Sequence, residues 1–256
     1  GFERDGDVAR GPGVVDMKSG LSSIFFALEA LRATWPQGHR RLRLRVLINS
    51  DEEVGSPSSR GLFEALAPHL RAALVFEKGR RGDRIVTRRK GTGTFEVHAR
   101  GAEAHAGLAH GEGVNAIEAL ARCIPRVEAL TDYERGVTLN VGLIEGGTSK
   151  NTVPAAARCI IDGRYEDPAD GARIERRLRD AVEGGRLPER LAAARLELRG
   201  RFHRPPMVAT AASRGLLRRY GVHAEAVGLA AGEAPLQGGG SDANLLAAAG
   251  VPCIDG

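Results

Sequence analysis

The sequence has few cysteines, few aromatic residues and no long uninterrupted apolar run. Its 256 residues contain three cysteines, Cys123, Cys159 and Cys253, which lie far apart and form no Cys-x-x-Cys pair. This spacing argues against a disulfide framework and against a thiolate zinc site. Aromatic residues make up 4% of the chain, and none is interleaved with its short basic runs. That pattern does not favour a nucleic-acid-binding surface.

No apolar run reaches transmembrane length, and we find no internal repeat and no signal peptide. We therefore expect a cytoplasmic protein with no membrane partner. A chain of this length can bury a substantial core and hold one large domain or two small ones.

The formal net charge is +5, and the basic residues gather in short runs at 40–41, 80–81 and 88–90. Runs this short are typical of solvated faces, so we expect no nucleic-acid partner. The positive balance suits small acidic ligands, although only weakly.

The first 84 residues alternate between the two hydrophobic periodicities. Apolar residues at helical spacing occupy 21–31 and 62–70, and short apolar runs at 42–48 and 72–76 are typical of strands. Such alternation predicts a mostly parallel sheet covered by helices. In that fold, functional groups belong at the carboxyl ends of the strands.

From about residue 87 to residue 199 the pattern changes to β-α-β-β-α-β, the order of a small two-layer α+β sandwich. After residue 200 the helix and strand patterns return. We expect an α/β protein in which residues 1–86 and 200–256 form a catalytic domain. Residues 87–199 are then an inserted lid and dimerisation domain.

Acidic residues follow the predicted strands and precede the first helix. Glu52 and Glu53 come shortly after the apolar run 42–48, Glu77 ends the run 72–76, and Asp16 precedes the helix. On an extended backbone, adjacent side chains point in opposite directions, so the two neighbouring glutamates can have different roles. A solvated acidic turn is the alternative for such a pair.

Carboxylates in these positions suit Mg²⁺, Mn²⁺ or zinc, and a site with two metal ions also needs a base beside the bound water. Glu52 is the candidate base. Glu53 and Glu77 are candidate terminal ligands, and Asp16 is the candidate bridge.

Seven motifs in one order make the chain resemble a known family. They are Gly11-x-Gly-x-x-Asp16-Met-Lys-x-Gly20, Glu52-Glu53, Phe76-Glu77, Ala104-His105-Ala-Gly107, Asn151-Thr-Val-Pro154, Asp162-x-Arg164 and Gly238-Gly-Gly-Ser-Asp242. Together they are similar to the M20 zinc metallopeptidases, in particular the glutamate carboxypeptidase branch. The resemblance implies a hydrolase with two zinc ions that cleaves an amide bond of an N-acyl amino acid or dipeptide with a free carboxylate.

The resemblance also implies roles outside the acidic cluster. His105 reaches the reacting carbonyl, often from the partner subunit of a homodimer joined through the lid domain, and Asn151 and Arg164 bind substrate. A guanidinium suits a carboxylate because it makes two parallel hydrogen bonds. Gly239 and Gly240 offer backbone N–H groups to the same carboxylate.

The chain departs from the family pattern at both ends. The family has a His-x-Asp motif about thirty residues before the bridging aspartate, and a metal-binding histidine shortly after a segment like residues 251–256. Neither is present here. We therefore expect that the sequence is an internal part of a longer protein and that, as written, it does not hold two zinc ions tightly.

Several alternatives stay open. A related deacylase, such as an acetylornithine deacetylase or a succinyl-diaminopimelate desuccinylase, shares the same metal site, and a non-catalytic dimeric binding protein is the third candidate. For single residues, Arg164 has a structural ion pair with Asp162 as its alternative, and residues 238–240 have a flexible turn. We expect Asp242 to cap a helix and His98 to face outward from its strand.

Overall fold

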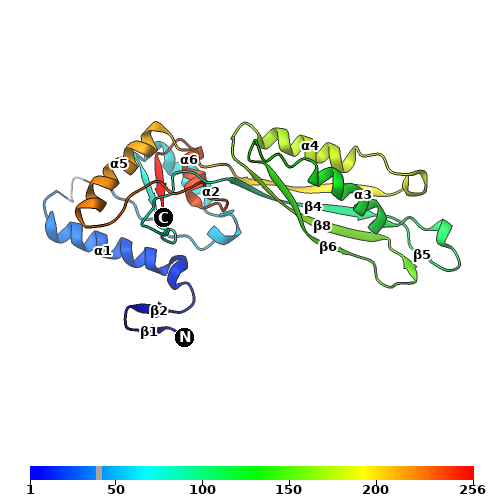
Figure 1. Ribbon diagram of the computed structural model, residues 1–256, viewed down its shortest axis with the longest axis horizontal. Helices are drawn as coiled ribbons and strands as arrows, with labels where there is room; N and C mark the ends of the chain where they lie inside the picture. The colour runs from blue at the N-terminus through cyan, green and yellow to red at the C-terminus, as the bar shows by residue number, and fades with distance from the viewer. Residues whose placement is uncertain (39–41) are drawn as a thin grey trace. The chain divides into compact units, whose positions relative to one another are not determined.

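The structure is a computed structural model that describes residues 1–38 and 42–256. It divides into two compact units (Figure 1). The first unit comprises residues 1–89, 207–237 and 241–256, and the second comprises residues 90–206 and 238–240. The basic pair predicted at 40–41 lies outside the described residues.

The second unit is built on a four-stranded antiparallel sheet in the order β6-β8-β4-β9. Its strands are β4 (Gly91–Arg100), β6 (Thr138–Gly146), β8 (Ala156–Tyr165) and β9 (Arg195–Arg204). The last strand therefore continues five residues past the expected boundary at Arg199. A separate short ribbon pairs β5 (Ala104–His105) with β7 (Thr152–Val153).

Two helices, α3 (Ala116–Glu128) and α4 (Gly171–Glu183), pack against this sheet (Figure 1). Along the chain, the sheet strands and these helices follow the order β-α-β-β-α-β. The core between the layers includes Phe95, Leu120 and Leu178, each at most 1% exposed. Short 3₁₀ turns lie at His110–Glu112 and Glu189–Leu191.

Strand β6 departs from the strict alternation that its sequence predicts. Its pairing register with β8 shifts between Val141 and Leu143, so one extra residue interrupts the alternation. Leu143 and Ile144, at and just after the shift, are 60% and 54% exposed. The side-chain pattern alone did not reveal the irregularity.

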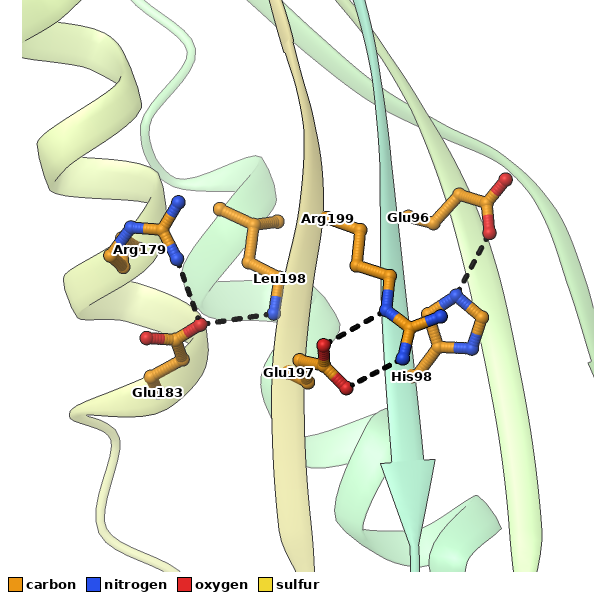
Figure 2. A network of polar contacts seen from close by, with 7 residues as sticks. All are labelled: Glu96, His98, Arg179, Glu183, Glu197, Leu198 and Arg199. Carbon is orange, nitrogen blue, oxygen red and sulfur yellow. Dashed lines mark hydrogen bonds and ion pairs between the residues drawn. The ribbon is translucent and has the colours of Figure 1, made fainter.

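Polar contacts bind α4 to β9 and cover the outer face of the sheet (Figure 2). Glu183 Oε1 accepts hydrogen bonds from Arg179 Nη1 at 3.0 Å and from the backbone N–H of Leu198 at 3.1 Å. On the face opposite the core, His98 Nε2 lies 2.9 Å from Glu96 Oε2. His98 thus lies on the outward strand face, as its sequence position predicts.

The strands described in the first unit are short. β3 (Ala73–Val75) pairs in parallel with β10 (Cys253–Asp255), and β1 (Glu3–Asp5) pairs antiparallel with β2 (Val8–Arg10). Its helical segments are η1 (Val14–Lys18), α1 (Ser19–Thr34), η3 (Glu52–Val54), α2 (Arg60–Leu66), η4 (Ala67–His69), α5 (Ala211–Ala226) and α6 (Asp242–Ala248). A buried cluster joins α2, α6 and β10 through Phe63, Leu246 and Cys253.

Two predictions for this unit were wrong. Residues 42–48 form no strand in the structure, and Leu44 and Ile48 are 56% and 71% exposed. An apolar run identifies residues that gain from burial, but a strand also needs a hydrogen-bonded neighbour, and the described residues supply none. Instead of a mostly parallel sheet, the described part of this unit has one parallel pair of strands.

The helix predicted over 62–70 is shorter than expected. α2 ends at Leu66, and a 3₁₀ turn containing Pro68 follows it. Proline has no N–H for the helical hydrogen bond, which accounts for the change. None of the described helices combines the length and apolarity that crossing a membrane requires.

Candidate functional site

The glutamate pair lies on a turn and not on a strand. Glu52 and Glu53 begin the 3₁₀ segment η3, and Gly55 caps its end in the left-handed conformation with φ 91°. At three residues per turn, successive side chains point about 120° apart, so the opposite orientation expected from an extended backbone is wrong. Glu52 is half-buried and Glu53 is exposed. The two side chains still have different surroundings, as separate roles require.

Two aspartates, Asp51 and Asp242, hold this turn in place. Asp51 accepts hydrogen bonds from the backbone N–H groups of Ser58 at 2.7 Å and Ser59 at 3.0 Å, and from the Ser59 hydroxyl at 2.5 Å. These bonds, the hydroxyl bond above all, lower the pKa of Asp51 to about 2. Asp51 is therefore ionised and serves to shape the loop.

Asp242 fixes the other side of the turn. Its carboxylate accepts a hydrogen bond from Asn49 Nδ2 at 2.8 Å and another from the Ser56 hydroxyl. It is the first residue of α6, while the N-cap is Ser241, whose side chain accepts from the Ala243 N–H. The expectation that Asp242 caps the helix was thus wrong by one residue, because the hydroxyl of Ser241 satisfies the free N–H group.

Glu77 follows β3, at the carboxyl end of the strand, as predicted. Burial raises the pKa of Glu77 to about 7, and the negative charges of Asp255, Glu52 and Asp16 add to the effect, while Arg89 opposes it. The electrostatic contributions place Asp16, Glu52 and Glu77 in one neighbourhood. Of the other three predicted acidic residues, Glu52 and Asp16 thus act on the charge of Glu77.

Asp255 belongs to the same cluster and was not predicted as a site residue. It ends β10, and its register partner is Val75, two residues before Glu77. Its carboxylate is 2% exposed and accepts through Oδ2 from Arg89 Nε and from Ser241 Oγ, both at 2.6 Å. Its other oxygen, Oδ1, is buried and has no partner among the described residues. The sequence signal was an acidic residue that closes an apolar run, the same signal that identified Glu77.

The first turns of α1 bring Asp16 toward this cluster. Asp16 lies in η1, directly before α1, and is exposed. Gly20, in the first turn of α1, lies so close to Phe76 that a Cβ there would lie 2.5 Å from the Phe76 carbonyl oxygen. This close approach positions the residues before α1 beside the end of β3, where Glu77 lies.

The donor chemistry of the cluster suits a divalent cation. Carboxylate oxygens are suitable ligands, the negative charges around Glu77 repel one another, and the Asp255 Oδ1 atom is buried without a partner. Within the described ranges, however, no three His, Cys, Asp or Glu side chains are placed to hold a metal ion together. The residues fit a cation in charge and chemistry, and they do not by themselves complete its coordination.

In the second unit, His105 ends β5 and Asn151 directly precedes β7 of the same ribbon. His105 pairs in register with Thr152, and the Ala106 N–H donates to the Asn151 carbonyl at 2.9 Å. His105 Nδ1 accepts from the Gly107 N–H at 3.1 Å, which orients the exposed imidazole.

Arg164 lies far from that ribbon. β7 leads into β8 at Ala156, and eight residue steps of about 3.3 Å put Arg164 about 26 Å along the strand from Ala156. Its guanidinium binds Asp162 through Nε and Nη2 at 2.8 and 2.9 Å, and Nη1 donates to the Gly238 carbonyl at 3.0 Å. The structure thus contains the ion pair named as the structural alternative, and it also brings Arg164 to the glycine loop.

The two predicted loop glycines differ in their surroundings. A Cβ at Gly239 would meet open space, whereas one at Gly240 would lie 2.9 Å from the Cδ atom of Arg204. Only Gly240 therefore has a steric reason to be glycine.

Comparison with known proteins finds relatives along the whole chain. Residues 87–187 match the peptidase dimerisation domain (M20_dimer). The chain is 29% identical over 255 residues to carboxypeptidase G2 from Pseudomonas sp. (strain RS-16), covering 99% of this chain and 60% of that protein. It is 35% identical over 146 residues to acetylornithine deacetylase from Myxococcus xanthus, covering 53% of this chain and 38% of the relative.

A solved structure shares the fold. The crystal structure of aminopeptidase PepT from Bacillus cereus ATCC 10987 superposes with a TM-score of 0.74 at 22% identity, covering 100% of this chain and 67% of that chain. The present chain spans about 60% of the length of its relative carboxypeptidase G2. Residues 87–187 thus match the M20 peptidase dimerisation domain, and the chain as a whole is similar to carboxypeptidase G2.

Proposed function

We propose that the protein containing this chain is a metal-dependent hydrolase that cleaves the amide bond of an N-acyl amino acid or dipeptide with a free carboxylate. The observation that carries the proposal is the acidic cluster around Glu77, at the carboxyl ends of the parallel strands β3 and β10. So much mutually repelling, partly buried negative charge is typical of a site that binds a cation. The similarity to carboxypeptidase G2 supports the glutamate carboxypeptidase branch.

In this proposal Asp16, Glu53 and Glu77 would hold two zinc ions, together with ligands from outside the described residues. Bound zinc would polarise the scissile carbonyl and lower the pKa of a coordinated water. Glu52 takes the proton from the attacking water and returns it to the leaving nitrogen. The loop bonds made by Asp51 and Asp242 keep Glu52 in position for both transfers.

Arg164, Gly239 and Gly240 then bind the substrate carboxylate, while His105 and Asn151 contact the reacting carbonyl and the substrate. Within one chain the first group and the second lie near opposite ends of β8, about 26 Å apart along the strand. A small substrate cannot reach both groups in one second unit. The separation supports a homodimer in which the two groups at one site come from different copies.

The test uses the complete protein, including the segments that precede and follow these residues, loaded with zinc. We expect hydrolysis of N-acyl amino acids and dipeptides with a free α-carboxylate, and little hydrolysis of the corresponding α-amides. Tight binding of such compounds without cleavage of any of them, across a broad panel, would contradict the proposal and favour the non-catalytic dimeric binding protein.

A related deacylase is the second candidate. The similarity to acetylornithine deacetylase and to a succinyl-diaminopimelate desuccinylase from Cereibacter sphaeroides, 29% identical over 181 residues, favours it. Both candidates share the acidic cluster, so the same substrate panel separates them. Preference for an N-acetyl or N-succinyl group over an N-terminal amino acid would assign the deacylase.

A further inference from the structure

A hollow of about 490 Å³ lies in the second unit. Three segments form it: the loop between β6 and β7, the segment after β5, and the start of α3. Its volume is within the range of about 300–1,000 Å³ that small-molecule sites occupy. Nothing in the proposed hydrolysis uses its interior.

The lining of the hollow includes a positively charged side chain and no negatively charged one. Lys150 and His110 line it together with the hydroxyls of Thr148 and Ser149, and none of its lining residues is acidic. The Lys150 ammonium has no carboxylate within 4.0 Å in the described part of the chain, whereas Lys90, Arg135, Arg164 and Arg190 of this unit are paired. An unpaired ammonium at a concave surface is a site for an anion.

The start of α3 adds to this positive character. α3 is 13 residues long, its N-cap Asn115 lines the hollow, and the positive end of the helix dipole therefore points there. The acidic residue in the first turn of α3, Glu118, binds Arg122 and Arg190 instead, which neutralises its charge.

The remaining wall is apolar. Ile117, Val153 and Pro154 line the side of the hollow next to these polar groups. Val153 and Pro154 are themselves buried, so this wall is fixed by packing. An apolar wall beside a few convergent donors is the usual construction of a small-molecule site, in which the donors set the orientation.

We propose that this hollow binds the carboxylate of a small molecule with an apolar body, with Lys150 as the cation that recognises it. The hollow lies beside the ribbon that carries His105 and Asn151, and away from Arg164. If the proposed hydrolase function holds, the ligand is a substrate with a second carboxylate, distinct from the α-carboxylate that Arg164 would bind. The binding step itself does not depend on that function.

Binding is tested on the isotope-labelled 256-residue chain by NMR titration with hexanoate and, as the neutral counterpart, hexanamide. We expect a Kd of about 1 mM for hexanoate, with shift changes at Thr148, Lys150 and Ile117, and much weaker binding of hexanamide. Lys150→Gln should weaken hexanoate about tenfold, and Lys150→Arg should restore most of the affinity.

The matched control is Arg177→Gln, which removes one exposed positive charge from α4 without touching the hollow. Equal weakening by Lys150→Gln and Arg177→Gln would overturn the proposal, because it would mean that only net charge matters. So would shift changes outside the hollow, equal binding of hexanamide, or tighter binding of inorganic phosphate than of hexanoate.

A kinetic comparison on the complete enzyme separates this proposal from the proposed function. Lys150→Gln should raise KM for substrates with a second carboxylate and leave KM for neutral substrates unchanged. If hydrolysis occurs but this selectivity is absent, the hollow is not a substrate subsite. If hexanoate binds as expected and no substrate is cleaved, the proposed function fails and the site stands.

Discussion

Asp51 and Glu77 are both acidic residues of the first unit, yet the pKa values of their carboxyl groups shift in opposite directions. Asp51 receives hydrogen bonds from Ser58 and Ser59, which favour its ionised form. Glu77 is partly desolvated and faces other carboxylates, which disfavour its ionised form. The difference separates a carboxylate that shapes a loop from one suited to a cation, although both residues follow apolar segments in the sequence.

The different positions of Glu52 and Glu53 lead to a prediction about their roles. Glu52→Gln preserves shape and removes the base, so we expect kcat of the complete enzyme to fall about 10²–10⁴-fold while its zinc content stays unchanged. Glu53→Gln should lower the zinc content instead. Metal analysis and kcat are measured on the same preparations, and equal loss of zinc in both variants would show that the two roles are wrongly assigned.

At the scale of elements, close contacts decide where the acidic residues lie. α1 can begin beside β3 only because residue 20 has no side chain, since any Cβ there would meet the Phe76 carbonyl oxygen at 2.5 Å. In the second unit, the length of β8 has the opposite effect and keeps Arg164 away from His105. Both results come from how the elements pack, which motif spacing along the chain does not report.

Gly20→Ala tests the contact between α1 and β3. Alanine favours helix formation, but here its methyl group must displace the Phe76 backbone, so we expect a loss of about 1–3 kcal/mol in the free energy of unfolding of the first unit. The control is Gly215→Ala in α5, where the nearest heavy atom is a flexible arginine at 3.8 Å. That change should raise the free energy of unfolding of the first unit by up to about 1 kcal/mol. Equal effects in urea unfolding would contradict the packing argument.

Asp170, at the start of α4, gives a prediction about pH. It is 2% exposed, and hydrogen bonds from Arg135 and then Arg173 lower its pKa. Because the folded-state pKa lies below the unfolded value of about 3.9, the stabilisation is fully present above that pH. It is lost as the pH falls through the folded-state pKa.

Asp170→Asn should therefore lower the free energy of unfolding of the second unit by about 1.5–3 kcal/mol at neutral pH. The difference from wild type should shrink once the pH falls below about 4. Urea unfolding at a series of pH values from neutral to acidic measures this difference in the free energy of unfolding. Asp180→Asn, at an exposed position of the same helix, is the control and should have little effect. A difference that stays constant down to the lowest pH would assign the effect to packing.

At the scale of the whole molecule, the proposed dimer needs a surface on the second unit. β6 is an edge strand of the four-stranded sheet, and it exposes Leu143 and Ile144. Edge strands with exposed apolar side chains tend to pair with another chain.

Sedimentation of the 256-residue chain at micromolar concentration should therefore show a dimer. Changing Leu143 and Ile144 together to lysine should convert it to a monomer, because lysine on an edge strand opposes pairing. Val222→Lys, on the exposed face of α5 in the first unit, is the matched control and should leave the dimer intact. A wild-type monomer, or a dimer that survives both lysines, would exclude this edge as the interface.

The sequence by itself indicated the four sheet strands and two helices of the second unit, because their apolar residues follow the strand or helix period over most of their length. Phe95 and Val97 report the strand period, and Ile174, Leu178 and Val182 report the helical one, whichever partner they pack against. The sequence also placed Glu77 at the end of a strand, because an acidic residue that closes an apolar run is a local signal.

Only the tertiary structure decided the pairing of strands and the surroundings of each carboxylate. The apolar run at 42–48 reads as a strand, but no described segment pairs with it. Asp255 joins Glu77 because β10 lies parallel to β3, although 178 residues of sequence separate the two carboxylates. Hydrogen bonding between strands and the electric field at a carboxyl group depend on neighbours in space, and local sequence patterns do not specify those neighbours.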